Sequence, residues 1–416
     1  MLAGLRENLG ALGERDFRLL FSGTVVTTVG DRIAGIALAF AVLDIGSATD
    51  LGIVFAVRQV VEALVLVGGG VLSDRLPRNL VIGGASLVQG AAQAATAALV
   101  LTGSGSILAI VVLQGIYGIG AGLVVPAEVG LVPQTVSPAR LQQANALQGL
   151  SGNLTRILGP AIGGLLVVAG SPGTALGLDA LSFIACAALL YRIKIAPRPA
   201  SEHKEGFVHE LRTGWQEFTS RNWLWASTVL FGIGNLGFCA WIILGPVIAK
   251  QDLGGAGAWG TIIAIGGVGT IVGSMIALRI RPRRPLVACT IWAIPLAGQV
   301  LVLAVAPSVW LLSVAAFCAG AGLSVHLTLW FTLFQREIPE AVQSRVSSYD
   351  VLFSFVLMPL GFAIVGPLSD AIGVTETLWL SLGVMLTTWA LILSLPSVRA
   401  LEAPAADQTA TPTMAA

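Results

Sequence analysis

The chain has few charged residues for its length. Only 11% of its 416 residues are Asp, Glu, Lys or Arg, whereas soluble domains carry about 25%. Hydrophobic residues make up 55% of the sequence, and the mean hydropathy is +0.86. We therefore expect most of the chain to be solvated by lipid. The net charge of +1 also argues against nucleic-acid binding.

Features of soluble enzymes are also missing. The four cysteines lie far apart in apolar runs without metal-ligand spacing, which predicts small buried side chains, at Cys186, Cys239, Cys289 and Cys318. There is no phosphate-binding P-loop, no Cys/His metal cluster and no nucleophile elbow. We expect neither an enzyme nor a cofactor. No secretory signal is evident in residues 1–18.

Long apolar runs recur along the chain. A membrane-spanning helix needs about 20 apolar residues. Cutting at charges, prolines and turn residues leaves about twelve such runs. They cover residues 17–43, 50–72, 80–102, 106–128, 143–169, 174–195, 222–249, 257–279, 285–306, 308–334, 345–369 and 374–396. The sequence thus predicts an all-α membrane protein.

Basic residues are distributed unevenly over the turns between these runs. Of the 23 Lys and Arg residues, Arg32, Arg58 and Arg156 fall within spans and Lys250 borders an outer turn. All the others fall on one side, whereas the opposite turns carry acids, at Asp44, Asp50, Asp252 and Glu376. Because basic loops stay in the cytoplasm, we expect a plasma-membrane protein with both termini cytoplasmic.

One long polar stretch, residues 196–221, divides the chain into two halves. We expect helical bundles at 1–195 and 222–396 and a disordered tail at 397–416. Similar strings in the two halves, Gly159-Pro160 and Met358-Pro359, indicate a weak repeat of two six-helix units. Apolar residues at helical spacing predict an amphipathic connector helix on the inner membrane face, from Phe207, Val208, Leu211, Trp215 and Phe218. An ordinary linker with scattered aromatics is the alternative.

Ionisable residues within the spans are the first functional candidates, because each costs about 2.5–3.5 kcal/mol to insert. Asp31 and Arg32 are adjacent in the first span. Adjacent helical residues point in different directions, so the two do not simply neutralise each other. Burial favours a protonated carboxyl, and Asp31 is therefore a candidate proton carrier. A structural carboxylate bonded to a neighbouring helix is the alternative.

Other charged residues within the spans extend this set. Arg58 and Glu62 are four residues apart, on one face of the second span, where they form either a structural ion pair or a proton-coupling pair. Arg156 in the fifth span is placed to meet Asp31 or Glu62, or to hold an anionic substrate group. Glu128 and Asp350, near the inner ends of the fourth and eleventh spans, are interpreted as interfacial, and Asp179 lies near the outer end of the sixth.

The turn between the second and third spans carries a distinctive motif. Its residues Gly70, Asp74, Arg75 and Arg78 follow the pattern Gly-x-x-x-Asp-Arg-x-Gly-Arg, with Pro77 in place of the second glycine. The motif resembles the signature loop of the major facilitator superfamily. The resemblance implies that Asp74 pairs with Arg345, at the start of the eleventh span, as a cytoplasmic gate. Anchoring by the two arginines alone is the simpler alternative.

A glycine-proline motif in the fifth span supports the same resemblance. Gly159, Pro160, Gly163 and Gly164 are similar to the motif of the antiporter branch, although Thr155 stands where the family has a further glycine. Proline bends the helix, and the glycines permit close helix contact. In the fourth span, Gln114 occupies a position where the superfamily usually has arginine.

Polar and aromatic residues within the spans are candidates for lining a substrate cavity. They are Arg32, Gln89, Gln93, Gln114, Asn145, Asn153, Asn235, Trp241, Gln299, His326 and Trp330. His326 is also a candidate proton relay. Bridging between helices is the alternative role for each of them.

Over nearly the whole chain, the sequence resembles bacterial drug-efflux and secretion members of the superfamily, similar to macrolide and siderophore exporters. That resemblance implies the major facilitator fold, with twelve transmembrane helices in two six-helix pseudo-repeats. It also implies alternating access and proton-coupled antiport of a small amphipathic molecule, driven by the proton gradient. We expect a monomer whose partners are small molecules, protons and lipid. An importer or facilitator of a polar solute, and a non-transporting sensor, stay open as alternatives.

Overall fold

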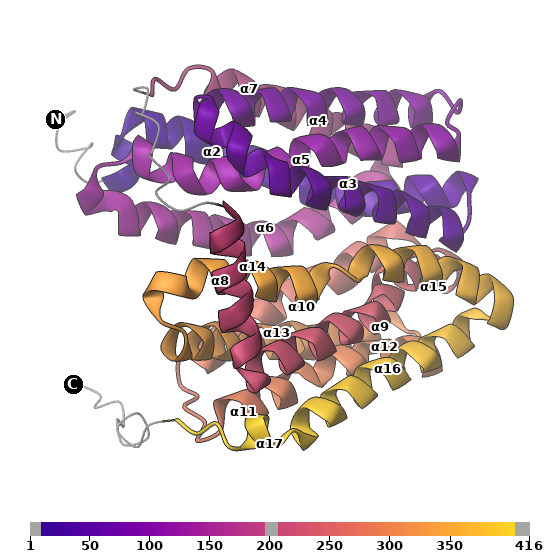
Figure 1. The fold of residues 1–416 in the computed structure, drawn as a ribbon. Helices are drawn as coiled ribbons and strands as arrows, with labels where there is room; N and C mark the ends of the chain where they lie inside the picture. The colour runs from indigo at the N-terminus through magenta and orange to yellow at the C-terminus, as the bar shows by residue number, and fades with distance from the viewer. Residues whose placement is uncertain (1–9, 196–206, 404–416) are drawn as a thin grey trace, which may run out of the picture. The chain divides into compact units, whose positions relative to one another are not determined.

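The structure, a computed structural model, describes residues 10–195 and 207–403 (Figure 1). Side chains are described throughout these ranges except at 67–75, 207–211 and 341. All regular secondary structure in the described residues is helical, so the predicted all-α architecture is confirmed.

Residues 10–195 form six long helices and two short 3-10 turns. The helices are α2 (Arg15–Ile45), α3 (Ala48–Arg75), α4 (Arg78–Leu101), α5 (Ile107–Thr135), α6 (Leu141–Ala169) and α7 (Pro172–Leu190), and the turns are η1 (Gly10–Gly13) and η2 (Pro138–Arg140). Side-chain caps begin several of these helices, among them α3, where the Asp50 amide donates to Ser47 Oγ at 3.3 Å. Ser106 accepts a hydrogen bond from the Ala109 amide at 3.3 Å, and Ser171 and Thr174 form a capping box around Pro172. Gly103 turns the chain between α4 and α5 with φ of 65°, a conformation that glycine adopts without strain.

Residues 207–403 continue the helical pattern. Their helices are α8 (Phe207–Ser220), α9 (Asn222–Asp252), α10 (Ala256–Ala277), α11 (Pro285–Ala293), α12 (Pro295–Val305), α13 (Val309–Glu337), α14 (Glu340–Phe355), α15 (Met358–Ile372), α16 (Val374–Ser394) and α17 (Pro396–Arg399). Gly254 and Gly255, both with positive φ, separate α9 from α10. α17 stands at the start of the predicted tail, and residues 404–416 lie outside the described range.

The helices match the predicted spans closely. Eleven stretches of the described chain are helical, long and apolar enough to cross a membrane. α3 coincides with the remaining predicted span at 50–72, although the description of its side chains stops at residue 66. Large apolar side chains are exposed along the helices, as at Leu64, Leu108 and Val129. In a bilayer these side chains face hydrocarbon, so the chain is a multi-pass membrane protein.

Prolines explain where the helices depart from the predicted spans. The ninth span is divided into α11 and α12 at Pro295, and the eleventh into α14 and α15 just before Pro359. Proline cannot donate the backbone hydrogen bond that would continue the preceding turn. In contrast, α5 accommodates Pro126 and Pro133 and extends past the predicted end at residue 128.

Packing divides the chain into two compact units. The first unit is Met1–Glu202 with Pro246–Ala264, and the second is His203–Gly245 with Ile265–Ala416. The end of α9 and the start of α10 therefore belong to the first unit. In the second unit, the connector helix α8 packs aromatic rings against α14, with Phe218 stacked on Phe353 at 5.6 Å between ring centroids. Its predicted position on the membrane face stays a prediction.

Candidate functional site

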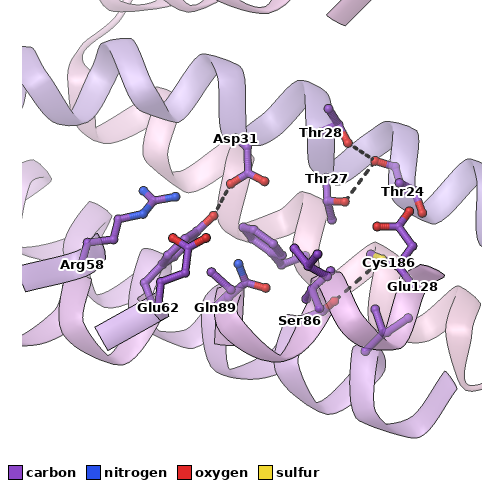
Figure 2. A pocket seen from close by; sticks show the side chains of 16 residues that line it. Thr24, Thr27, Thr28, Asp31, Arg58, Glu62, Ser86, Gln89, Glu128 and Cys186 are labelled. Carbon is purple, nitrogen blue, oxygen red and sulfur yellow. Dashed lines mark hydrogen bonds between the residues drawn. The ribbon is translucent and has the colours of Figure 1, made fainter. Parts of the chain in front are cut away.

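A cavity of about 250 Å³ lies inside the first unit, walled by α2, α3, α4, α5 and α7. Figure 2 shows Asp31, Arg58 and Glu62 toward one end of it, and Thr24 and Glu128 toward the other. The space has room for several waters, each of which takes about 30 Å³. Drug-sized ligands need pockets of about 300–1,000 Å³. The cavity therefore suits water and protons better than a large cargo.

Tyr117 connects the carboxyl of Asp31 to the guanidinium of Arg58. The buried Tyr117 hydroxyl on α5 donates a hydrogen bond to Asp31 Oδ1 on α2. The Arg58 guanidinium carbon lies 3.9 Å from the centroid of the Tyr117 ring. Such a cation–π contact contributes roughly 2 kcal/mol when it is desolvated. Phe183 holds the ring edge-on, at 5.7 Å between centroids.

A chain of side-chain amides leads from Arg58 to a second carboxyl. Arg58 Nη1 lies 3.5 Å from Gln114 Oε1, and Gln114 Nε2 donates to Gln93 Oε1 at 3.1 Å. Gln93 Nε2 then donates to Asp179 Oδ2 at 2.8 Å. Gln93, Gln114 and Asp179 are all buried. The network thus joins α3, α5, α4 and α7 without leaving the interior of the first unit.

Glycines bring these helices close enough for the network to form. A Cβ on Gly118 of α5 would lie 2.6 Å from the Arg58 carbonyl oxygen, and a Cβ on Gly122 would lie 2.6 Å from that of Glu62. One turn of α5 is therefore in backbone contact with α3. Gly118 and Gly122 are therefore required to be glycine, because α5 contacts the backbone of α3 at these two positions.

Arg58 and Glu62 share the cavity but do not form an ion pair in the described structure. Their spacing on α3 does place both side chains on one face, as predicted. The ion pair itself is a wrong prediction, because Arg58 turns toward Tyr117 and Gln114 instead. The proposed coupling roles of both residues stay predictions.

Arg32 and Asp31 point in different directions, as adjacent helical positions require. The stem of Arg32 lies against Gly159 of α6, where an added Cβ would collide with it. Arg156, also on α6, is close enough to interact electrostatically with Arg32. Both arginines are exposed. No hydrogen bond or ion pair in the described residues joins Arg156 to Asp31 or Glu62, so those predicted partners are not brought together.

The glycine-proline motif of α6 forms close contacts within the first unit. A Cβ on Gly163 would lie 2.9 Å from the Ile33 carbonyl oxygen of α2, and one on Gly164 would lie 2.6 Å from that of Ala256 in α10. The carbonyl of Pro160 in turn faces Gly260. The motif therefore serves close helix packing on two sides, as its composition predicts. Its antiporter role stays a prediction.

The predicted cytoplasmic gate is only partly described. The side chains of Gly70, Asp74 and Arg75 lie outside the described residues. Arg78 at the start of α4 donates a hydrogen bond to the Gly130 carbonyl of α5 at 2.6 Å. Arg345 lies in α14 of the second unit, where its Cβ lies close to Gly214 of α8. The pairing of Asp74 with Arg345 stays a prediction.

The predicted cavity-lining residues are divided between the units. In the first unit, Gln89 lines the described cavity with its Oε1 unpaired, Gln114 lies in the amide chain, and Asn153 is exposed on α6. In the second unit, Trp241 and Gln299 are buried. Asn235 Nδ2 donates to the Ser354 carbonyl at 2.8 Å, a bridge between helices. Their roles toward a substrate stay predictions.

A second cluster surrounds Asp350 in the second unit. Thr228 Oγ1 donates to Asp350 Oδ1 at 2.8 Å, and Trp330 Nε1 donates to Oδ2 at 3.0 Å. Asp350 is only 6% exposed, so its side chain lies inside the helix bundle. Its interpretation as interfacial in the membrane stays a prediction. His326 contacts the Cys289 carbonyl through Nδ1 at 2.9 Å and meets the ring of Phe231 edge-on. These contacts anchor His326 between helices, and the relay role stays a prediction.

Some important side chains were missed or misplaced by sequence analysis. Tyr117 was passed over because a tyrosine in a glycine-rich helix gives no sign of what its hydroxyl meets. Asp179 was placed near the end of a span, yet it is fully buried. Its neighbour Ser182, one turn further on, is the sequence signal for a polar site there. The predicted burial of the cysteines is correct for three of them, and Cys318 is exposed.

Comparisons with known proteins agree with this architecture. The sequence is 27% identical over 367 residues to the enterobactin exporter EntS of Escherichia coli O127:H6, covering 85% of each chain. It is 25% identical over 419 residues to the multidrug efflux pump Tap of Mycobacterium bovis, covering 94% of this chain and 96% of Tap. These relatives are transporters rather than enzymes.

Solved structures share the fold at low sequence identity. A bacterial homologue of the lysosomal transporter Spinster superposes with a TM-score of 0.73 at 13% identity, covering 92% of this chain and 96% of that one. A bacterial homologue of the iron transporter ferroportin gives 0.72 at 16% identity, covering 91% and 98%. The profile of the transmembrane secretion effector family matches residues 7–416. The chain therefore belongs to the transmembrane secretion effector family, a branch of the major facilitator superfamily whose members include siderophore and drug exporters.

Proposed function

We propose that this protein is a proton-coupled antiporter that exports small amphipathic compounds by alternating access, with Asp31 as a proton-binding group. The observation that carries the proposal is the contact of Asp31 with Tyr117 and, across the Tyr117 ring, with Arg58. Asp31 also lines a water-sized cavity within a membrane protein. A carboxyl in that position can exchange protons with water in the cavity. Its charge also acts on the neighbouring Arg58 guanidinium.

The coupling follows from electrostatics in a medium of low dielectric constant. When Asp31 is ionised, its negative charge and the Arg58 cation attract each other strongly, because little water screens them. When Asp31 is protonated, that attraction is lost, and Arg58 interacts with Gln114 and the remaining carboxyls instead. Because Arg58 and Tyr117 lie on α3 and α5, a change in their attraction to α2 biases how these helices pack. Proton binding can drive a conformational change only if the two conformations differ in their affinity for the proton, and this change in attraction provides such a difference.

The class of cargo is inferred from the relatives and from exposed positive charge. EntS exports enterobactin and Tap is a multidrug efflux pump, by their names. In this chain, Arg32 and Arg156 present two exposed guanidinium groups from α2 and α6. Paired arginines favour carboxylate or similar anionic groups. We propose amphipathic cargo, with an anionic siderophore as the first compound to test. We also propose that the protein acts as a monomer with both termini in the cytoplasm.

The proposal is tested in sealed proteoliposomes that contain a pH-sensitive dye. With a proton gradient imposed, we expect cargo from a panel of siderophores and antibiotics to move against the direction of the protons. Asp31→Asn should fold and bind cargo but lose this coupling. Asp252→Asn, the same change at an exposed helix end, is the matched control and should behave as wild type.

Three outcomes would contradict the proposal. Proton-driven counterflow of normal rate in Asp31→Asn would exclude Asp31 as the proton site. Cargo movement in the same direction as protons would indicate an importer. Binding of cargo without any movement across the membrane would indicate a sensor.

A further inference from the structure

Helix packing alone does not explain why the carboxyl of Asp179 is buried in the first unit. It lies in the middle of α7 and is fully buried. Its oxygens meet Gln93 Nε2 at 2.8 Å and Ser182 Oγ at 3.3 Å, and no ion pair to it exists among the described residues. A buried carboxylate without a cation beside it is costly, so such groups are usually paired or neutral.

The hydrogen-bond directions around Asp179 follow from Arg58. An arginine has only donors, so Gln114 must present its oxygen to Arg58 and its NH₂ group to Gln93. Gln93 must then accept from Gln114 and donate to Asp179 Oδ2, as observed. The amide chain therefore transmits the polarity of Arg58 to Asp179. Asp31 and Asp179 are both electrostatically connected to this single cation, one through Tyr117 and the other through two amides.

The other oxygen of Asp179 has a place for a proton. Ser182 Oγ donates its hydrogen to the Asp179 carbonyl oxygen at 2.7 Å. A hydroxyl has one hydrogen, and its lone pairs can accept others. The 3.3 Å contact between Ser182 Oγ and Asp179 Oδ1 is longer than an ordinary O–H···O hydrogen bond, and it leaves room for a hydrogen on Oδ1 that points to the Ser182 oxygen. The contacts therefore accommodate the neutral carboxylic acid as well as the carboxylate.

Asp179 also lies directly beside the proton site proposed above. A Cβ on Gly30, the residue before Asp31, would collide with Asp179 Oδ1 and with Ser182 Oγ. The charged or titratable groups that act on Asp179 from the surrounding helices are Asp31 on α2, Arg58 on α3 and Tyr117 on α5; α4 contributes the neutral Gln93. With both aspartates ionised, Asp31, Asp179 and Arg58 carry a net charge of −1, and one proton makes these three groups neutral. Glu62, which also interacts electrostatically with Arg58 and Asp31, is not part of this count.

We propose that Asp179 is a second proton-binding carboxyl, which shares one proton with Asp31 around Arg58 during transport. The inference rests on the proposed proton coupling and extends it to a residue on α7. In the state with Asp31 ionised, the hydrogen resides on Asp179 Oδ1. The same hydrogen can pass to ionised Asp31, and Asp31 exchanges it with the water of the cavity. Asp31, Asp179 and Arg58 are together neutral when the proton is on either carboxyl, and they carry a net charge of −1 when it has left to the cavity.

The test combines infrared spectroscopy with transport. Asp179→Asn reproduces the neutral acid, because its oxygen can accept from Gln93 and its NH₂ can donate to Ser182, so the variant should fold. In acid-minus-alkaline infrared difference spectra of the purified protein, we expect the C=O bands of wild type to include those of the Asp31 and Asp179 carboxylic acids. One band should be absent in Asp179→Asn and the other in Asp31→Asn. Ser182→Ala should shift the Asp179 band, and Asp252→Asn should change neither.

In proteoliposomes, Asp179→Asn should abolish most of the cargo-coupled proton movement, because asparagine can neither take up nor release the shared proton. Cargo affinity should stay unchanged. An unaltered infrared spectrum together with wild-type pH dependence would overturn the proposal. If wild type itself moves no protons, the proposed function fails, while the Asp179 band still reports whether this carboxyl binds a proton.

Discussion

The two units bury their polar groups in different ways. In the first unit, carboxyls, an arginine, a tyrosine and two amides form one network across five helices, from Asp31 through Tyr117 and Arg58 to Asp179. In the second, the single carboxyl of Asp350 accepts from the neutral donors Thr228 and Trp330. Aromatic rings pack around Trp330: the rings of Trp223 and Phe231 both lie edge-on to its indole.

We interpret the difference as one between the proposed proton-binding role of the first network and a structural role of the second. In the first unit, a proton on one carboxyl changes the attraction of Arg58 to its neighbours, because the guanidinium is shared. In the second, two fixed neutral donors satisfy Asp350, so the site joins α9, α13 and α14 with little dependence on another ionisable group. We therefore expect proton coupling to depend on the first unit and cohesion of the bundle on the second.

The largest effect is expected from breaking the backbone contact that supports the first network. Gly118→Val places atoms where only 2.6 Å separates a Cβ from the Arg58 carbonyl oxygen. Overpacking of this kind costs about 1–3 kcal/mol or more, and here it also displaces Arg58. We expect a lower unfolding temperature together with loss of transport. Gly149→Ala is the control: no atom lies within 4 Å of the added Cβ, and alanine favours the helix. Equal damage by both variants would contradict the close-contact explanation.

A smaller and purely structural effect is expected in the second unit. Asp350→Ala leaves the Trp330 and Thr228 donors unsatisfied, at a cost of about 1–3 kcal/mol for each buried group. Thermal unfolding should show this loss, while the folded fraction keeps proton-coupled transport. Asp350→Asn, which retains an acceptor, should recover part of the stability. Loss of coupling in a variant that unfolds at the wild-type temperature would instead move Asp350 into the proton pathway.

The sharpest comparison uses Tyr117→Phe and Trp330→Phe, each of which keeps an aromatic ring but removes one hydrogen-bond donor to an aspartate. Tyr117→Phe deletes the hydroxyl that bonds Asp31 and keeps the ring beneath Arg58. We expect an altered pH dependence of transport, because the lost hydrogen bond stabilised ionised Asp31 by about 1.5–3 kcal/mol, with a loss of stability no larger than that. Trp330→Phe removes the indole donor to Asp350 and should lower stability while leaving the pH profile in place. The reverse pattern would mean that the roles of the two units are exchanged.

Much of the fold follows from local features that a sequence displays directly. Apolar length, basic turns and helix-breaking residues predicted each helix to within a few residues at most ends, because a bilayer requires long apolar helices with charges at their ends. The errors lie at prolines, whose effect depends on context: Pro133 is tolerated inside α5, whereas Pro295 begins a new helix. Composition does not distinguish these cases, since tertiary packing determines whether the broken backbone contact is compensated.

The sequence by itself determined that this is a many-span membrane protein, which residues are costly to bury, and that the glycines of α6 permit close contact. Only the tertiary structure decided the partners of the costly residues. Arg58 is four residues from Glu62, yet it turns to Tyr117, and Asp179 joins Gln93 from 86 positions away. Spacing along one helix shows which side chains share a face. The neighbouring helix that supplies their partners depends on how the helices pack, and local sequence patterns do not carry that information.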